Sequence, residues 1–367
     1  MVKRISYGVI SDVHQDPRVV PITIDVLKKL GAEKLLVNGD IGNRQETLKQ
    51  SQAFVGFILD SIGKSGLESF VQPGSHETLL AFGPVLDYFS GKYGNIIDAT
   101  KHPKSEQDGH DLVFLPGSDW SCGGEYMLGN LPNVPSGRYI KNEKGLVRFE
   151  EFKQYIGALQ QGISKGAMQY TSMQDLENLV TAPEKTVVVC HVPRRFDNPN
   201  CVDVAEFGKP FEDVQQWEVE FAGGKTGTIY SRNLHTEQLT SFWKANNVRK
   251  VISGDVISES TILTSDKTKE ILSQDPLLPF AIERENRGNL DLARLYEKIG
   301  ITKAVNGHFH ESSHRANNRA GNHVQEGEQV KELFWNSGHL DVGHTGILTI
   351  EGDKASYRNV CLQDYLQ

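Results

Sequence analysis

The sequence has few cysteines, with four among its 367 residues. Cys122, Cys190, Cys201 and Cys361 lie far apart and include no Cys-x-x-Cys pair. This spacing indicates neither a zinc knuckle nor a disulfide framework. Cys190 stands inside an apolar run, where a free thiol usually packs in the core.

The sequence also lacks an apolar run of about 18 residues, the length that a membrane-spanning helix needs. Its first residues, Met1–Tyr7, run directly into the first predicted strand, and we therefore expect no signal peptide. These two absences together predict a cytoplasmic protein that makes no contact with a membrane.

Positive charge is in deficit, with 39 Lys and Arg against 47 Asp and Glu and a net charge of −8. This balance argues against a protein that coats polyanions, because non-specific affinity for nucleic acid depends on positive charge. The net charge does not exclude a local basic groove. Charged residues at 23% and hydrophobic residues at 38% are ordinary for a globular protein. We find no linker and predict one domain over residues 1–367.

The first part of the chain alternates between strands and helices. Short apolar strands are predicted at Ile5–Ile10, Lys34–Val37 and Ser69–Gln72, and each is followed by a segment with helical apolar spacing. This alternation is typical of a parallel sheet covered by helices. The sequence therefore predicts an α/β fold.

The rest of the chain is less regular. Further strands are predicted at Asp111–Leu115, Thr186–Cys190, Thr302–Val305, Gly346–Ile350 and Ala355–Val360. The stretches 91–170 and 198–290 interrupt the pattern, and we interpret them as insertions. Within the second stretch a helix is predicted at His235–Asn246 and a strand at Arg249–Ile252, with Asp255 in the turn that follows.

Polar side chains that can bind metals follow five of the predicted strands. They are Asp12 and His14, then Asp40, then Ser75 and His76, then His191, and finally His308 with His310. Any one of these motifs has an ordinary explanation as a turn or a helix cap. Because the carboxyl ends of parallel strands lie at one edge of a sheet, the side chains together can converge. Such a set can hold two divalent ions about 3.5–4 Å apart, an arrangement used for phosphoryl chemistry.

The order of these motifs carries a family resemblance. Asp-x-His, Gly-Asp, Gly-Ser-His-Glu, His-x-Pro and Gly-His-x-His follow one another between residues 12 and 310. This ordered set resembles the calcineurin-like metallophosphoesterase family, and so does the later Asn336-Ser337-Gly338 stretch. The resemblance implies a four-layer α/β/β/α sandwich with inserted segments.

The resemblance also implies a ligand set. One ion would be held by Asp12, His14 and His310 and the other by His191 and His308, while Asp40 would bridge both. The family motif Gly-Asn-His supplies an asparagine oxygen to the second ion, and this sequence has Ser75 there. A serine hydroxyl is a shorter and weaker ligand, so we expect a looser second site. Manganese is the expected metal, with iron, zinc, nickel or magnesium as alternatives.

The same resemblance implies a mechanism in which a hydroxide bridging the two ions attacks phosphorus. His76 is the candidate general acid or oxyanion stabiliser, with Glu77 or Asp40 orienting its ring. Three arginines are candidate phosphate clamps, because guanidinium groups match phosphate oxygens. They are Arg44, Arg194 and Arg195, and a solvated surface charge is the alternative for each. His339 is placed by the sequence to reach the site. Trp120 is interpreted as a lid, a stacking platform or ordinary packing.

Three functions compete at this point. The first is hydrolysis of a phosphodiester or phosphomonoester, with a small molecule or nucleic acid as the substrate. The second is a DNA or RNA nuclease similar to the double-strand-break-repair branch of the same family. The sequence shows no basic run interleaved with aromatic residues, which a nucleic-acid channel would need. The third is a binding or scaffold protein with a degenerate site, similar to the retromer-subunit relatives, but only Ser75 departs from the ligand pattern.

Overall fold

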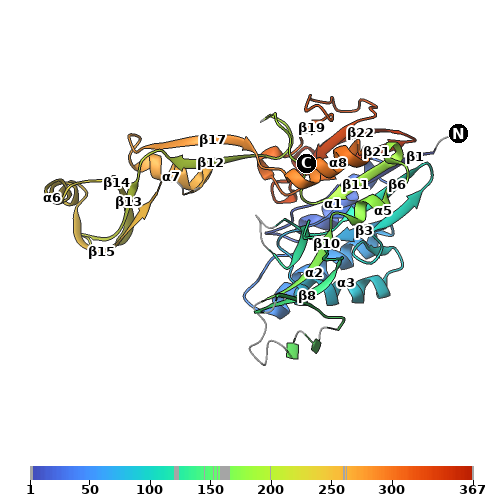
Figure 1. The fold of residues 1–367 in the computed structure, drawn as a ribbon, viewed down its shortest axis with the longest axis horizontal. Coiled ribbons are helices and arrows are strands. Elements are labelled where there is room, and N and C mark those ends of the chain that lie inside the picture. The colour runs from blue at the N-terminus through green and yellow to red at the C-terminus, as the bar shows by residue number, and fades with distance from the viewer. Residues whose placement is uncertain are drawn as a thin grey trace. The chain divides into compact units, whose positions relative to one another are not determined.

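The structure is a computed structural model that describes residues 3–119, 124–143, 145–151, 153–154, 156–157, 166–198, 200–258, 261 and 263–365. The chain forms two compact units (Figure 1). The first combines Met1–Val204 with Asn286–Gln367, and the second is Ala205–Glu285. The second unit lies within the stretch 198–290 that the sequence analysis interprets as an insertion.

The first sheet of the large unit has six strands in the order β22-β21-β1-β2-β3-β4. They are β1 (Arg4–Ile10), β2 (Lys34–Asn38), β3 (Glu68–Gln72), β4 (Ile96–Asp98), β21 (His344–Glu351) and β22 (Lys354–Cys361). Strands β1 to β4 are parallel, whereas β21 runs antiparallel to β1 and pairs with β22. The parallel sheet expected from the alternating pattern is therefore present.

Three helices cover one face of this sheet. They are α1 (Val19–Lys29), α2 (Leu48–Ser65) and α3 (Leu79–Lys92). Apolar residues at helical spacing, such as Ile58 and Ile62, form one buried cluster with strand residues such as Leu35 and Val71. The Thr47 side chain accepts a hydrogen bond from the Gln50 amide and so caps the first turn of α2.

The second sheet has the order β19-β20-β18-β11-β6-β5. Its strands are β5 (Lys104–Gln107), β6 (His110–Leu115), β11 (Thr186–Cys190), β18 (Lys303–Asn306), β19 (Ala316–Asn317) and β20 (Leu333–Asn336). Strands β6, β11, β18 and β20 are parallel. Its outer face packs against α5 (Asp175–Leu179) and α8 (Leu290–Ile299), where Leu176 and Leu292 join the buried cluster.

The alternating valines of β11 show how the two sheets stack. Val188 faces the cluster beneath α8, whereas Val187 and Val189 join a separate cluster with Val9 and Phe70 of the first sheet. A strand buried on both faces reads as a continuous apolar run, as this one does. The large unit is therefore an α/β/β/α sandwich.

A smaller sheet of order β7-β10-β8-β9 forms within the stretch 91–170. Its strands are β7 (Tyr126–Gly129), β8 (Gly137–Asn142), β9 (Gly145–Arg148) and β10 (Ala167–Ser172). Tyr126, Ile140 and Ala167 belong to the core beneath α2 and α3, so one face of this sheet packs on the sandwich. Short 3₁₀ turns also belong to the large unit, at Pro183–Lys185, His310–Ser312, Leu340–Val342 and Leu362–Tyr365.

The small unit, as far as its residues are described, contains two three-stranded sheets and two helices. Its elements are β12 (Val204–Pro210), β13 (Val214–Phe221), β14 (Thr226–Arg232), α6 (Thr236–Ala245), β15 (Val248–Ile257), β16 (Leu263–Thr264), α7 (Ser265–Gln274) and β17 (Phe280–Asn286). The predicted helix at His235–Asn246 is α6. Asp255, however, lies inside β15 opposite Gln216 and not in a turn. This strand is longer than expected because it pairs along β13.

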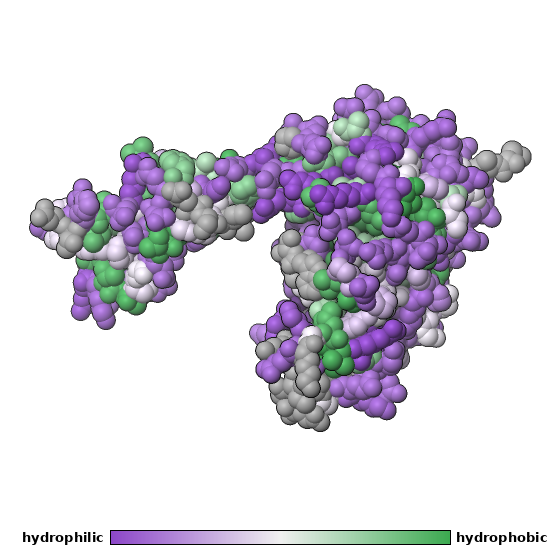
Figure 2. Space-filling view, viewed as in Figure 1, coloured by the Kyte–Doolittle hydropathy of each residue, from purple (hydrophilic) through white to green (hydrophobic). Residues whose placement is uncertain are grey.

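The described residues include no helix that is both long enough and apolar enough to cross a membrane. On the visible face of the molecule, hydrophilic residues dominate and apolar residues appear in small patches (Figure 2).

Two glycines of α2 offer a matched test of how α2 and α3 pack. Alanine favours a helix over glycine by about 1 kcal/mol. A Cβ at Gly56 would meet Phe89 at an ordinary 3.5 Å, whereas a Cβ at Gly63 would overlap the Tyr93 ring. We expect Gly56→Ala to raise the free energy of unfolding by up to about 1 kcal/mol. Gly63→Ala should lower it by about 1–3 kcal/mol through overpacking. Urea unfolding followed by circular dichroism measures both, and shifts of the same sign would contradict this packing.

Candidate metal centre

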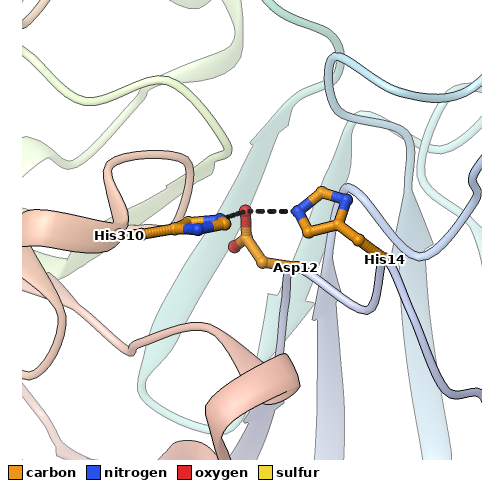
Figure 3. Close-up of side chains that lie close together, drawn as sticks. All are labelled: Asp12, His14 and His310. Atoms are coloured by element: carbon orange, nitrogen blue, oxygen red, sulfur yellow. Dashed lines mark hydrogen bonds and ion pairs between the residues drawn. The ribbon is translucent and has the colours of Figure 1, made fainter. Parts of the chain in front are cut away.

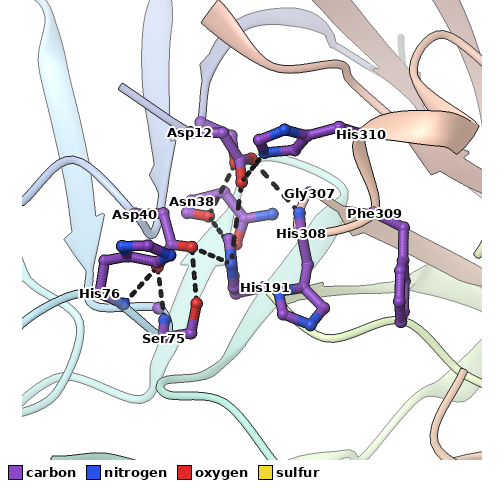
Figure 4. A network of polar contacts seen from close by, with 12 residues as sticks. Asp12, Asn38, Asp40, Ser75, His76, His191, Gly307, His308, Phe309 and His310 are labelled. Carbon is purple, nitrogen blue, oxygen red and sulfur yellow. Dashed lines mark hydrogen bonds and ion pairs between the residues drawn. The ribbon is translucent and has the colours of Figure 1, made fainter. Parts of the chain in front are cut away.

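The seven predicted metal ligands all follow strands of the two stacked sheets. Asp12 and His14 follow β1, Asp40 follows β2, Ser75 follows β3, His191 follows β11, and His308 and His310 follow β18. The structure brings them together, His14 beside Asp12 and His310 (Figure 3) and the other six in one polar network (Figure 4). The sandwich makes this possible because the carboxyl ends of the central strands from both sheets meet at one edge.

The first group of ligands consists of Asp12, His14 and His310 (Figure 3). Oδ1 of Asp12 lies 3.7 Å from Nε2 of His14 and 3.3 Å from Nε2 of His310. One ligand atom from each residue lies within 4.8 Å of the other two. Asp12 is only 1% exposed, so its charge is shielded from water. This donor set can hold a divalent ion.

The second group consists of Asp40, His191 and His308. Nδ1 of His191 donates to the carbonyl oxygen of Asn38 at 2.8 Å, which turns Nε2 toward the carboxylates. That Nε2 is buried and lies 3.0 Å from Oδ2 of Asp40, yet it forms no hydrogen bond of good geometry with any described residue. An imidazole oriented by a backbone carbonyl, with its other nitrogen directed at carboxylates, is typical of a metal ligand. The residues present therefore fit a metal ion.

Asp40 lies at the centre of the network, because it also belongs to a third group with His14 and His76. The Ser75 hydroxyl donates to Oδ2 of Asp40 at 2.7 Å, and the backbone amides of Ser75 and His76 donate to Oδ1 at 2.5 and 2.9 Å. The His14 and His76 rings lie 4.4 Å apart. Ser75 is thus in direct contact with the carboxylate that the resemblance assigns to both ions.

The backbone at the ligands is strained. Asp12, Asp40 and His308 have φ angles of 57°, 51° and 71°, in the left-handed region that residues other than glycine rarely adopt. Each such residue costs about 1–3 kcal/mol unless its surroundings enforce it, and such strain clusters at functional sites. Gly39 is also required, because a Cβ there would lie 2.8 Å from both Gly74 Cα and His191 Nδ1.

The charges of the cluster favour a cation. Burial opposes the charge of Asp12, but His191, His14 and His310 hold the pKa of its carboxyl well below the usual range. Burial likewise lowers the pKa of His191, yet the charges of Asp40 and Asp12 outweigh it and raise that pKa to about 10. Burial and the charge of His191 lower the pKa of His308 to about 4. Burial also opposes the charge of His14, but Asp12 and Asp40 outweigh this effect and raise the pKa of its imidazole. The two buried carboxylates therefore favour positive charge on the groups around them.

Glu77 has a different role from the one predicted. Its buried carboxylate accepts hydrogen bonds from the amides of Gly42 and Gly74, both at 2.7 Å, and so ties together the loops that carry Asp40 and Ser75. Burial and the charge of Asp40 raise its pKa to about 8. Among the described residues, neither Glu77 nor Asp40 forms a hydrogen bond with the His76 ring. The exposed His76 ring is not oriented in the predicted way.

The three arginines predicted to clamp phosphate have different surroundings. The guanidinium of Arg194 pairs with Glu297 at 2.9 Å and lies over the rings of Phe196 and Phe334, so it is part of the packing under α8. This contact corrects the prediction for Arg194. The exposed Arg195 lines a cavity with Arg194 and with none of the predicted metal ligands. Arg44 is exposed and lines a small hollow together with His76.

Several supporting residues escaped the sequence analysis. Asn38 and Asn306 donate their side-chain amides to the carbonyl oxygen of Cys190, at 3.3 and 3.0 Å, and so join the ends of three strands. The only signal for them in the sequence is an asparagine that directly follows an apolar strand. His339 stacks on His310 at 4.1 Å with an interplanar angle of 4°. Trp120 lies outside the described residues.

No protein-family model matches the chain, and no curated protein matches it. Among solved structures, the chain is similar to a crystal structure of the protein TT1561 of Thermus thermophilus, with 8% identity and a TM-score of 0.43. Another solved structure has 12% identity and a TM-score of 0.44. Both alignments cover 97% of this chain and 99% of the other. Likeness at this level carries no argument about function. Any argument about function must therefore come from the cluster of carboxylates and imidazoles.

Metal binding to this cluster should release protons. Imidazole ligates in its neutral form, and the raised pKa of His191 means that an ion must displace its proton below about pH 10. We therefore expect apparent Mn²⁺ affinity to rise with pH between about pH 6 and about pH 9. Calorimetry in buffers of different ionisation enthalpy measures both the affinity and the protons released. Affinity that stays constant with pH, with no proton release, would show that His191 does not ligate.

Proposed function

We propose that this chain is a two-metal phosphoesterase of the calcineurin-like type. The observation that carries the proposal is the convergence of two three-residue donor groups, Asp12 with His14 and His310, and Asp40 with His191 and His308. They come from four strands of two different sheets and follow the motif order that the resemblance requires. Two mixed imidazole and carboxylate sites side by side suit hydrolysis of a phosphate ester better than a structural metal site, which is typically closed and tetrahedral.

Different residues of the chain serve different steps of the proposed hydrolysis. When bound, two divalent ions supply a water-derived nucleophile at neutral pH and neutralise the charge of the phosphoryl oxygens. Asp12 and Asp40 would hold the ions in a buried place of low dielectric constant, where electrostatic stabilisation is strongest. His76 is exposed beside the cluster and donates a proton to the leaving oxygen. Arg44, which shares a hollow with His76, binds a phosphate oxygen of the substrate.

The bond hydrolysed is that of a phosphodiester or a phosphomonoester. The six carboxylate and imidazole positions of the two donor groups are all kept, which disfavours a scaffold role on a degenerate site. Net charge gives no support to a nucleic-acid channel. An assay with bis-p-nitrophenyl phosphate, p-nitrophenyl phosphate, and labelled single- and double-stranded DNA distinguishes diesterase, monoesterase and nuclease.

The sequence contains a matched pair of Gly-Asp dipeptides for testing the centre. We expect Mn²⁺-dependent hydrolysis of bis-p-nitrophenyl phosphate, and its loss in Asp40→Asn. Mutation of a residue that only supports a metal ligand typically lowers activity about 10–100-fold. Because Asp40 lies inside the cluster, we expect Asp40→Asn to lower activity by more than this. His76→Ala should lower kcat by about 10²–10⁴-fold. Asp255→Asn, in the exposed β15 of the small unit, is the control and should leave the activity unchanged. Turnover without divalent ions, or activity retained by both Asp40→Asn and His76→Ala, would contradict the proposal.

Ser75 offers a second test, independent of turnover. Its hydroxyl is bonded to Asp40, within reach of an ion held by that carboxylate. Ser75→Asn supplies the longer amide oxygen that the family motif has, and we expect it to tighten binding of the second Mn²⁺ by about tenfold. Ser75→Ala should not tighten it. Calorimetry reads both variants, and equal affinity in Ser75→Asn and the unaltered protein would show that position 75 does not approach the ion.

A further inference from the structure

The segment of residues 336–341 lies beside the first donor group, which consists of Asp12, His14 and His310. It begins at the last residue of β20 and runs into the 3₁₀ turn at Leu340–Val342. Its histidine and its aspartate, at positions 339 and 341, belong to none of the three ligand groups formed by the described residues. The segment is therefore placed to act on the ligands themselves.

The ring of His339 lies flat against the ring of His310. The two centroids are 4.1 Å apart and the planes differ by 4°. Nδ1 of His339 is buried and has no hydrogen-bond partner among the described residues, so the contact with His310 is one of stacking. The ring of His344 supports His339 in turn, at 5.8 Å and an angle of 67°. Because the side chain of His310 is 40% exposed, a flat neighbour restricts rotations that solvent would allow.

The carboxylate of Asp341 holds the backbone at His14. Its Oδ1 accepts hydrogen bonds from the amides of His14 and Gln15, both at 3.0 Å. The side-chain amide of Asn43 donates to the carbonyl oxygen of His14 at 2.7 Å. Both backbone polar groups of His14 are therefore bonded, and this fixes the direction in which its imidazole leaves the chain.

The same segment is tied to the other two loops of the first donor group. The amide of Leu340 donates to the carbonyl oxygen of Ser11, directly before Asp12, at 3.1 Å. The side-chain amide of Asn336 donates to the carbonyl oxygen of Phe309, directly before the second imidazole, at 3.0 Å. Leu340 is 1% exposed and belongs to the core beneath α1 and α2, so the segment is itself anchored.

We propose that His339 and Asp341 are positioning residues for the ion held by the first donor group. The inference rests on the proposed two-ion centre and adds two residues that its ligand motifs do not include. A metal site binds best when its donors are held in the required geometry beforehand, and residues that orient ligands typically change metal affinity about 10–100-fold. Since the contacts of His339 and Asp341 go to the His310 ring and the His14 backbone, they set the affinity of one ion and not of the other.

Calorimetry with Mn²⁺ tests this without turnover. We expect His339→Ala and Asp341→Ala each to weaken one of two bound ions about tenfold or more and to leave the other unchanged. His339→Phe keeps a flat ring for the stack, and Asp341→Asn keeps an oxygen acceptor for the two amides, so both should bind two ions as the unaltered protein does. If His339→Ala folds poorly, His339→Leu fills the space without a flat ring and should act in the same direction.

Electron paramagnetic resonance supplies a second readout. Two neighbouring Mn²⁺ ions are spin-coupled, whereas a single bound Mn²⁺ gives the signal of an isolated ion. At a concentration that loads both sites of the unaltered protein, the two alanine variants should show the isolated signal. A role of these residues in general stability would not produce this change while one site stays filled.

Asp98→Ala is the matched control, because the Asp98 carboxylate also accepts a backbone amide, that of Thr100 at 2.9 Å, but belongs to none of the ligand groups. It should bind both ions unchanged. Alanine variants that bind both ions normally, equal weakening of both ions, or failure of His339→Phe and Asp341→Asn to restore binding would overturn the inference. Two bound ions without hydrolysis would contradict only the proposed function, and an unaltered protein that binds no Mn²⁺ would overturn both.

Discussion

The burial of two carboxylates at the ends of adjacent strands is the constraint on which this structure depends. Asp12 is 1% and Asp40 is 2% exposed, and each follows a parallel strand of the first sheet. A buried negative charge is costly unless a partner compensates it. The second sheet supplies that partner as His191, which stands 3.0 Å from Asp40 and 4.0 Å from Asp12. The negative charge of Asp12 and Asp40 is therefore compensated only when the second sheet stacks on the first.

The polar residues beneath the cluster explain how it keeps its shape. Gln72 donates to the side-chain oxygen of Asn38 at 2.6 Å, and Asn38 in turn reaches the carbonyl oxygen of Cys190 in the other sheet. These hydrogen bonds link the two sheets, while Oε1 of Gln72 is buried with no hydrogen-bond partner among the described residues. The bonds join the sheets close to Asp12 and Asp40, whose left-handed backbone conformations persist only where the surrounding structure enforces them.

The sequence predicted that these side chains would converge, because their positions depend on topology. Strand ends in a parallel sheet share an edge whatever their detailed packing, so Asp12 and Asp40 converge once the strands are recognised. His191 follows a strand of the second sheet, and the stacking of that sheet was implied only by the family resemblance. The contacts of the arginines were harder to predict, because a guanidinium on a long side chain can reach several partners. Arg194 found Glu297 on α8, a residue more than a hundred positions away in the sequence. The Gly-Asp pair at Asp255 shows the same limit, since its strand pairs through a register that local pattern cannot reveal.

The contacts of Ser75 explain how the cluster keeps a second donor group without the asparagine of the family motif. The Ser75 hydroxyl donates its proton to Asp40, so its oxygen lone pairs remain free on the side away from that carboxylate. Asp40 receives three hydrogen bonds from the Ser75–His76 loop and is thereby fixed in place. One ring nitrogen of His76 also lies within 4.8 Å of a candidate ligand atom of His14 and of Asp40. Ser75 therefore contributes to the cluster by positioning Asp40.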